Sequence, residues 1–275
     1  MSLHFSKMHG IGNDFVVVDC RTRVFALNEE QIARIGDRHT GIGFDQLLTI
    51  MPARDSTCAF AYGIYNSDGS TSGQCGNGVR CVAAWLQRDG ALGAGGARLE
   101  SPSGPVEVVL RDDGRVRVAM GEPEFDPRMI PLDLPAVDPY VMQLAGQQIA
   151  FGAVSMGNPH AVIEVADVTA APLSTLGKTL STSRQFPRGC NVGFVEVVDR
   201  AHVNLRVWER GAGATLACGT GACAAVAVLH RRGTVDDEVA VALPGGTLEI
   251  SWAGTGHNLW MTGPAAFVYE GDIDE

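Results

Sequence analysis

The feature that most constrains this 275-residue sequence is a faint internal repeat, in which short segments recur in the same order. The segment "GIGNDFVVVD" (residues 10–19) resembles "SMGNPHAVIEV" (155–165), since both place Gly-Asn shortly before an apolar run. Further along, "GIGFDQLLTI" (41–50) resembles "CNVGFVEVV" (190–198). Preserved order indicates two related halves, because unrelated segments would not recur in sequence.

The spacing of the repeat identifies its kind. Asn13 and Asn158 are 145 residues apart, and Cys75 of "CGNG" and Cys218 of "CGTG" are 143 apart. A period this long excludes a solenoid or a propeller, whose units are much shorter. We therefore predict a duplicated domain related by an approximate two-fold axis.

Each half contains strand-like runs and one apolar helix. The runs rich in β-formers are "DFVVVDC", "FDQLLTI" and "CAFAYGIYN" in the first half, and "AVIEVAD", "NVGFVEVV" and "AHVNLRVWE" in the second. Helices are predicted over 76–88 and 219–232, where cations and glycine mark the C-terminal ends. Because "VAAWLQ" and "ACAAVAVL" have almost no polar stripe, these helices are expected to be surrounded by sheet.

These elements predict an α/β fold of the α+β type. It consists of two pseudo-symmetric domains, each a mostly antiparallel, barrel-like sheet wrapped around a central apolar helix. Residues 103–123 are predicted to form a hairpin turning at "DDG", and the Pro-rich residues 122–139 to cross between the halves. A strand predicted within residues 259–273 is long enough to return from the second half to the first. The expected domains are residues 1–117 plus 262–275, and residues 118–261.

Composition excludes several classes of function. The net charge of −10 and the lack of a Lys/Arg cluster argue against a nucleic-acid partner. No basic leader followed by an apolar segment is found, and no run of about 18 apolar residues, so a cytoplasmic protein without a membrane partner is expected. Seven cysteines in so long a chain predict reduced thiols, and their spacing predicts no metal site.

Cys75 and Cys218 are the candidate catalytic residues, because each directly precedes Gly-x-Gly and a helix in its own half. The N–H groups and partial positive charge of a helix N-terminus favour a thiolate, which predicts a lowered thiol pKa. The other cysteines are interpreted as buried structural residues. These are Cys20, Cys58, Cys81, Cys190 and Cys223.

A two-fold axis is expected to bring the two thiols face to face across the domain cleft. If one thiolate removes the α-proton of an amino acid and the opposite thiol delivers a proton to the other face, the stereocentre inverts. The carbanion requires electrostatic stabilisation, which first-turn N–H groups can give to the α-carboxylate. The candidate donors are Gly76, Asn77, Gly219 and Thr220. This scheme requires no cofactor.

Six motifs in order resemble the diaminopimelate epimerase family over essentially the whole chain. They are "HGIGNDFVVVD", "DRHTGIGFDQLL", "YNSDGSTSGQCGNGVRC", "MGNPHAV", "FPRGCNVGFVEV" and "RVWERGAGATLACGTGACA". The resemblance implies cofactor-independent interconversion of LL- and meso-2,6-diaminopimelate, in lysine and peptidoglycan precursor biosynthesis, by a homodimer. It implies Cys75 and Cys218 as the proton-transfer pair.

The resemblance also implies the residues around the thiols. His160 and Glu209 would tune thiol protonation, Arg210 would clamp the distal carboxylate of the substrate, and Glu209 would also accept from an ammonium group. The implied side-chain contacts to substrate are Asn13, Gln46, Asn66, Asn158, Asn191, Glu209 and Arg210, with main-chain contacts at Gly76, Asn77, Gly219 and Thr220. His39 in "DRHTG" is interpreted as a loop histidine.

The chain departs from the family pattern in a paired way. Members commonly have Glu four residues before each catalytic cysteine, where this sequence has Thr71 and Ala214. Phe44 likewise stands where a small residue is usual. Because the residues expected to contact the substrate are all present, we expect these two positions either to support the contacting residues from behind or to shape the surrounding loops.

Three alternatives remain open from the residues. Proline racemases and hydroxyproline epimerases also use paired cysteines, although Arg210 favours a substrate with a distal carboxylate. The segment "GTGACA" (219–224) matches a loose dinucleotide fingerprint, but no buried strand directly precedes it. Finally, Cys75 and Cys218 could form a redox or structural disulfide in a binding protein.

Overall fold

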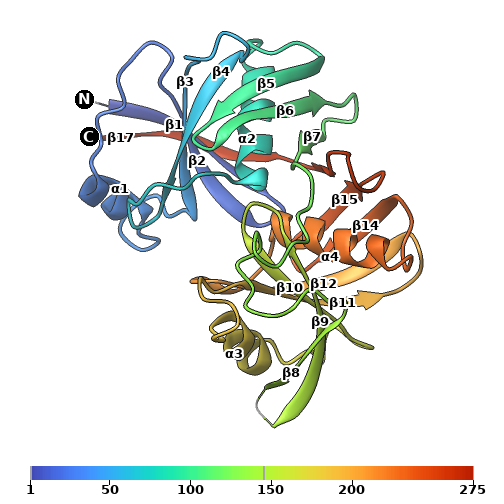
Figure 1. The fold of residues 1–275 in the computed structure, drawn as a ribbon. Coiled ribbons are helices and arrows are strands. Elements are labelled where there is room, and N and C mark those ends of the chain that lie inside the picture. Colours follow the sequence, from blue (N-terminus) through green and yellow to red (C-terminus); the bar gives the residue numbers. More distant parts are fainter. Residues whose placement is uncertain (1, 145, 275) are drawn as a thin grey trace. The chain divides into compact units, whose positions relative to one another are not determined.

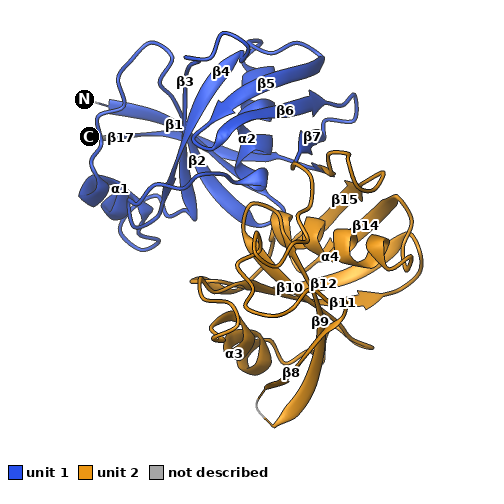
Figure 2. Cartoon of the chain, viewed as in Figure 1, with its two compact units in different colours: residues 1–119, 262–275 blue, residues 120–261 orange. Residues whose placement is uncertain are grey.

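The structure is a computed structural model that describes residues 2–144 and 146–274 (Figure 1). The chain divides into two compact units, residues 1–119 with 262–275, and residues 120–261 (Figure 2). The first boundary between the units therefore lies after Ala119, whereas the sequence predicts it after residue 117. No helix among the described residues is long and apolar enough to span a membrane.

Within the part of unit 1 that the structure describes, eight strands pair in a continuous ladder and two helices are present. The strands are β1 (Ser2–Gly10), β2 (Asn13–Asp19), β3 (Gln46–Pro52), β4 (Phe60–Asn66), β5 (Gly95–Ser101), β6 (Gly104–Leu110), β7 (Val116–Ala119) and β17 (Ala266–Asp274). The helices are α1 (Glu29–Gly36) and α2 (Gly76–Arg88). The ladder runs β17-β1-β2-β3-β4-β5-β6-β7, and only the β2–β3 and β4–β5 pairs are parallel.

Unit 2 repeats this arrangement. Its strands are β8 (Tyr140–Leu144), β9 (Gln147–Ser155), β10 (Pro159–Glu164), β11 (Asn191–Val197), β12 (His202–Glu209), β13 (Gly213–Thr215), β14 (Glu238–Leu243) and β15 (Gly246–Ser251), and β16 (Trp260–Gly263) spans the second break. Its helices are α3 (Lys178–Ser181), preceded by a π-helical turn over Leu173–Gly177, and α4 (Gly219–Arg231). The ladder runs β8-β9-β10-β11-β12-β14-β15, and its parallel pairs are β10–β11 and β12–β14.

The two ladders share their register as well as their order. Phe15 pairs with Gln46 across the parallel β2–β3 pair, and His160 pairs with Asn191 across the parallel β10–β11 pair. Phe15 and His160 are 145 residues apart, and so are Gln46 and Asn191, which is the spacing of the repeat. The internal repeat is therefore a structural duplication, as predicted, with His160 at the position of Phe15.

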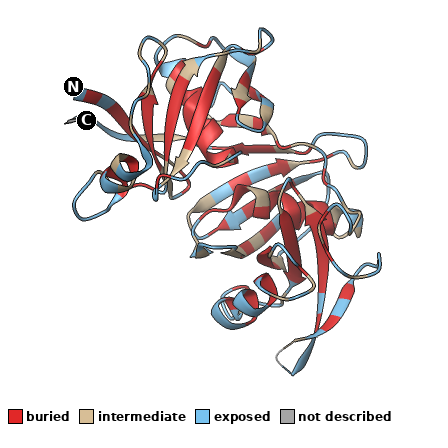
Figure 3. Ribbon diagram, turned by 60° about the vertical axis from the view of Figure 1, so that its left-hand side comes forward, coloured by how far each residue is buried: buried red, intermediate tan, exposed pale blue. Residues whose placement is uncertain are grey.

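Each central helix lies inside its curved sheet. Helix α2 contacts β1, β2, β3, β6 and β7, which lie toward both ends of the ladder, and α4 contacts β9, β10, β11, β12 and β15. A helix can contact both ends of a ladder only if the sheet curls around it. Burial follows from this (Figure 3), since all of α4 except Thr220, His230 and Arg231 is buried. The predicted sheet wrapped around an apolar helix is confirmed.

The Pro-rich segment 122–139 differs from its prediction. It does not cross between halves but belongs to unit 2, where Ile130 and Leu132 join a core cluster with Phe151 and Phe194. The apolar residues spaced between its prolines give it side chains to bury, whereas a crossing strand needs only to span a distance. The predicted hairpin at "DDG" is confirmed by the β6–β7 pair, and the returning strand by the β1–β17 pair.

Candidate active site

Cys75 is the N-cap residue of α2, as its place before Gly-x-Gly predicts. Its backbone is extended (φ −146°, ψ 108°), and its Sγ accepts a hydrogen bond from Gly78 N at 3.4 Å. Gly76 and Asn77 form the first turn, where the backbone N–H groups point out of the N-terminal end of the helix. The sulfur therefore lies among the donors of a helix N-terminus, which is the geometry that supports a thiolate and an adjacent carboxylate.

The amides predicted in unit 1 lie in two groups. Asn13 Oδ1 lies 3.9 Å from Cys75 Sγ and accepts from Asn77 Nδ2 at 3.2 Å. Gln46 Nε2 donates to Asn66 Oδ1 at 3.0 Å across the β3–β4 pair. Unit 1 thus brings Cys75 together with two of the amides and joins the other two to each other.

Cys218 is likewise the N-cap residue of its helix, α4, but it is more enclosed than Cys75. It is buried with an extended backbone (φ −116°, ψ 101°), and its Sγ lies 3.7 Å from Thr220 Oγ1. Asn158 Nδ2 donates to that Thr220 hydroxyl at 3.4 Å. Since Gly219 and Thr220 form the first turn, unit 2 reproduces the cap, the first turn and the neighbouring amide of unit 1.

Burial changes the prediction for the Cys218 thiol. The pKa of Cys218 lies well above its ordinary range, chiefly because burial disfavours the thiolate and further because the Glu209 carboxylate is close. Hydrogen bonds from Thr220 and the Gly221 backbone lower the pKa but do not prevail. The lowered pKa expected from the helix N-terminus is therefore wrong for Cys218, because desolvation outweighs the partial charge of the helix.

Glu209 ends strand β12 and is oriented by its neighbour. Thr215 Oγ1 donates to Glu209 Oε1 at 2.5 Å, from the short strand β13 that pairs with the end of β12. Repeat spacing places Glu209 at the position of Asn66. The two half-sites thus differ in charge at this position, because a carboxylate in unit 2 replaces an amide in unit 1.

His160 is held among amides and is neutral. Its Nε2 lies 3.0 Å from Asn158 Oδ1 and 3.4 Å from Asn191 Nδ2, while Asn191 Oδ1 accepts from Arg210 N at 2.9 Å. Burial lowers the pKa of His160 from 6.5 to about 3, with a smaller contribution from the Arg210 guanidinium. His160 reaches Cys218 through Asn158 and Thr220, so it is linked to the thiol rather than bonded to it.

The neutral His160 predicts acid lability. Its pKa is about 3 in the folded protein and ordinarily 6.5, so the unfolded chain binds the proton more tightly. The resulting stability is fully present above pH 6.5 and is lost as the pH falls toward 3. We expect the free energy of unfolding, measured by urea titration, to fall less steeply over this range in His160→Gln than in the parent. Equal slopes would contradict a neutral buried His160.

Arg210 follows Glu209 and is exposed. Its Nη1 donates to Arg188 O at 2.6 Å, which holds the side chain beside the 188–190 turn. Gly189 makes this possible, because its φ is +67° and a Cβ there would lie 2.9 Å from Arg210 Cδ. Most of the guanidinium donors therefore stay available for an anion such as a carboxylate.

The two positions that lack the family's glutamates are exposed and pair with a neighbouring strand. Thr71 pairs with Tyr65, and Ala214 pairs with Trp208, in each case one residue before Asn66 or Glu209. Because successive side chains alternate between faces, Ala214 lies on the opposite face from Glu209. Both positions are exposed, which supports a role in loop shape rather than contact with the thiols. Phe44, the other departure, is buried in the unit 1 core.

Restoring glutamate at both positions should therefore change little. We expect Thr71→Glu/Ala214→Glu to alter kcat and KM by no more than about twofold, as exposed substitutions usually do. Steady-state kinetics of the double variant beside the parent chain measure this. A large rise in turnover would instead show that the lost glutamates act on the reaction.

Two charged residues at the Cys75 site are absent from the sequence predictions. Arg80 is fully buried in α2 and donates through Nη1 to Asn77 Oδ1 at 2.9 Å, and Asp45 Oδ2 accepts from Asn13 Nδ2 at 2.8 Å. A buried arginine in an otherwise apolar helix is a signal that could have identified Arg80, because such a charge requires partners.

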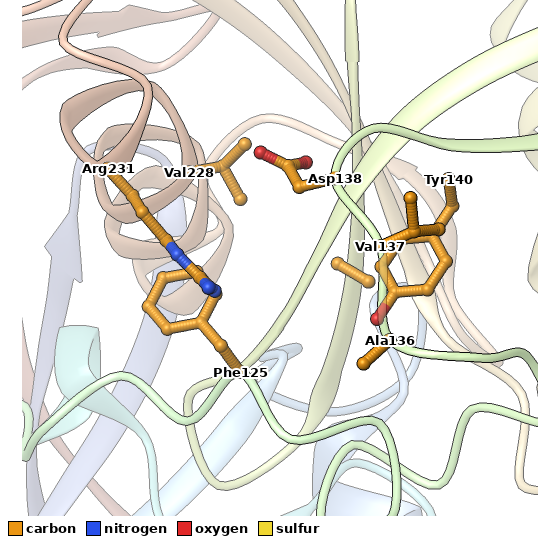
Figure 4. Close-up of a pocket in the computed structure, with 8 residues that line it drawn as sticks. Phe125, Ala136, Val137, Asp138, Tyr140, Val228 and Arg231 are labelled. Carbon is orange, nitrogen blue, oxygen red and sulfur yellow. The ribbon is translucent and has the colours of Figure 1, made fainter.

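The structure also contains a cavity of about 160 Å³ in unit 2 (Figure 4). It is lined by Phe125, Ala136, Val137, Asp138, Tyr140, Ala153, Val228 and Arg231. Val228 and Arg231 belong to the last turns of α4, about 15 to 20 Å along the helix from Cys218. The cavity is therefore separate from the thiol. No group of metal-binding side chains occurs among residues 2–144 and 146–274.

Comparisons with known proteins match most of the chain to one family. The family model described as diaminopimelate epimerase matches residues 5–125 and 152–268. Diaminopimelate epimerases of Xanthomonas axonopodis pv. citri (strain 306) and Xanthomonas euvesicatoria pv. vesicatoria (strain 85-10) are each 52% identical over 272 residues, which cover 98% of this chain and 96% of the relative.

Solved structures show how widely the fold is used. A hydroxyproline epimerase from Agrobacterium vitis matches with a TM-score of 0.72 at 17% identity, covering 99% of this chain and 92% of that chain. A PhzF-family phenazine biosynthesis protein from Bacillus anthracis matches with a TM-score of 0.72 at 15% identity over 100% of both chains. At such low identity these structures share only the fold, whereas the family model and the Xanthomonas relatives match the sequence itself. The chain therefore belongs to the diaminopimelate epimerase family, whose members are isomerases.

Proposed function

We propose that this protein converts LL-2,6-diaminopimelate to the meso isomer by two-base proton transfer between Cys75 and Cys218, without a cofactor. The observation that carries the proposal is the equivalent placement of the two thiols, each capping a buried central helix in its own unit. Membership of the family supplies the substrate. The product would serve lysine and peptidoglycan precursor biosynthesis.

In the proposed reaction one substrate engages both half-sites. One sulfur takes the α-proton, so the C–H bond breaks and an S–H bond forms, while the other thiol gives its proton to the opposite face of the same carbon. Negative charge moves into the α-carboxylate during this step. The first-turn N–H groups of Gly76, Asn77, Gly219 and Thr220 would stabilise that charge, because they are preorganised donors.

The charges around Cys218 suit this exchange. With its pKa raised, Cys218 rests as a thiol and can donate at once. In the reverse direction it must first lose its proton, and the nearby Glu209 carboxylate can accept it. His160 would keep Asn158 and Asn191 in place as a neutral group, which the lowered pKa of its ring supports.

The remaining polar groups suit a substrate with two amino-acid ends. Arg210 would bind the distal carboxylate through paired N–H donors, and Glu209 would accept from an ammonium group. The amides of Asn13, Gln46, Asn66, Asn158 and Asn191 offer both donors and acceptors, as a zwitterion requires. We also propose a cytoplasmic location and a homodimer, on the strength of family membership.

A direct assay tests the proposal. Reduced protein, dialysed against chelator and free of pyridoxal phosphate, is incubated with LL-diaminopimelate, and the isomers are separated by chiral chromatography. We expect meso-diaminopimelate to accumulate to equilibrium, with no inversion of L-proline or trans-4-hydroxy-L-proline. Failure to convert diaminopimelate would overturn the proposal, and inversion of either proline would favour the racemase alternative, whose solved relatives share this fold.

A further inference from the structure

A chain of side-chain hydrogen bonds runs past Cys75 with every donor pointing the same way. Arg80 Nη1 donates to Asn77 Oδ1 (2.9 Å), and Asn77 Nδ2 donates to Asn13 Oδ1 (3.2 Å). Asn13 Nδ2 then donates to Asp45 Oδ2 (2.8 Å). The chain therefore begins at a buried cation and ends at a carboxylate.

The charged ends fix the direction of the chain. An Asn amide can rotate to exchange its oxygen and nitrogen, so two amides alone could form this chain in either direction. A guanidinium can only donate, and an ionised carboxylate can only accept. Arg80 thus requires the oxygen of Asn77, Asp45 requires the nitrogen of Asn13, and the bond between the amides then satisfies both requirements.

Both ends are themselves held in place. Arg80 Nε donates to Pro264 O at 3.2 Å, and Gly10 leaves room for the guanidinium, since a Cβ there would lie 2.8 Å from Arg80 Nη2. Asp45 accepts from Arg38 Nη2 at 2.8 Å and from Asp14 N at 3.1 Å. The charges that orient the amides are therefore fixed before any ligand arrives.

Unit 2 provides an internal comparison, because the repeat places an uncharged residue at each end. Cys190 stands 145 residues after Asp45, and Cys223 stands 143 residues after Arg80; both are buried. There the amide of Asn158 points the other way, with Nδ2 donating to Thr220 Oγ1 and Oδ1 near His160 Nε2. The repeat-related amides of Asn13 and Asn158 therefore point in opposite directions, and only the Asn13 amide has charged residues at the ends of its hydrogen-bond chain.

We propose that Arg80 and Asp45 are positioning residues that hold the Asn13 and Asn77 amides in one orientation at the Cys75 half-site. The inference rests on the proposed function, because it assigns both amides to the substrate site. In this orientation Asn13 presents its carbonyl oxygen to Cys75 Sγ at 3.9 Å. When the sulfur takes up the α-proton, the new S–H group finds an acceptor, whereas a rotated amide would present a second donor.

A double-mutant cycle distinguishes this role from general structural support. Arg80→Met removes the donor and keeps the stem, and Asp45→Asn removes the charge at a half-exposed position where folding should survive. We expect each to lower kcat/KM about tenfold, mainly through kcat, since a hydrogen bond to a charged group is lost. Because both variants disrupt the same chain of hydrogen bonds, the double variant should lose little more activity than the worse single variant.

Two further variants complete the design. Arg80→Lys retains a donor and should recover part of the activity lost in Arg80→Met. Cys190→Ala changes the equivalent of Asp45 in unit 2. Its kcat/KM should stay within about twofold of the parent value, because Cys190 is uncharged and orients no amide. Losses that multiply in the double variant, or unchanged kinetics in Asp45→Asn, would overturn the inference.

A readout without substrate separates this inference from the proposed function. In ¹⁵N-labelled protein the side-chain amide signals of Asn13 and Asn77 should show slow rotation and slow hydrogen exchange, and both should accelerate in Asp45→Asn. A parent protein with ordered amides but no epimerase activity would end the proposed function alone. An active parent whose amide signals do not respond to Asp45→Asn would end the inference alone.

Discussion

We expect Cys75→Ala and Cys218→Ala each to lower the rate of LL-to-meso conversion by at least about a thousandfold, because the proposed mechanism uses both sulfurs as proton carriers. The effect is large because no other acid or base at either half-site has a sulfur's place at the helix N-terminus. Neither variant should lose its fold, since Cys75 is half-exposed and alanine leaves only a small cavity at Cys218. Steady-state assay by chiral chromatography, with circular dichroism to monitor folding, measures both losses.

The matched control is Cys81→Ala. Cys81 lies in the same helix as Cys75, but it is fully buried and its pKa is raised to about 12 by burial, so it should be inert. We expect Cys81→Ala to retain activity within about threefold of the parent. A loss in Cys81→Ala as large as that in Cys75→Ala would show that packing, rather than proton transfer, explains the effect.

Glu209→Gln should lower activity while making Cys218 easier to ionise. The carboxylate raises the pKa of the Cys218 thiol, so the amide should allow that pKa to fall. Yet the amide cannot accept the thiol proton, and we expect kcat in the direction that uses Cys218 as base to fall about a hundredfold. The variant should therefore have more thiolate and less activity. A thiol that acted only as a nucleophile would show the opposite, because more thiolate would give more activity.

Ultraviolet absorbance of the thiolate, titrated with pH, tests the first effect when Glu209→Gln is compared with Glu209→Gln/Cys218→Ala. Thr215→Val is the matched control, because it removes only the hydroxyl that donates to Glu209. It should cost about tenfold or less. A Cys218 pKa that does not change in Glu209→Gln would contradict the electrostatic role assigned to the carboxylate.

Much of the fold follows from sequence because the repeat and the apolar helices are strong signals. Cys75 and Cys218 each precede Gly-x-Gly, which predicts a helix start, and an apolar surface all round predicts that sheet encloses the helix. The short helix α1 is missing from the sequence predictions, although Asn28 and Gln31 form a capping box that marks its start.

The amide-orienting residues could not be found from spacing alone. Asp45 reaches Asn13 only because β2 and β3 pair in parallel, with Phe15 opposite Gln46, and nothing local to either residue encodes that register. The Cys218 pKa was mispredicted for a related reason. The helix terminus is visible in sequence, but the burial that outweighs it depends on strands distant in the chain.

The central claim is that two different sulfurs act on opposite faces of one carbon, and the most direct test is the early time course in D₂O. LL-diaminopimelate is incubated with the parent protein, and deuterium at the α-carbon is measured by mass spectrometry in both substrate and product while conversion is small. We predict deuterium in the meso product, delivered by a solvent-exchanged thiol, and none in the recovered LL substrate. Deuterium appearing equally in recovered substrate and product would show that one base serves both faces, and would contradict the two-thiol account.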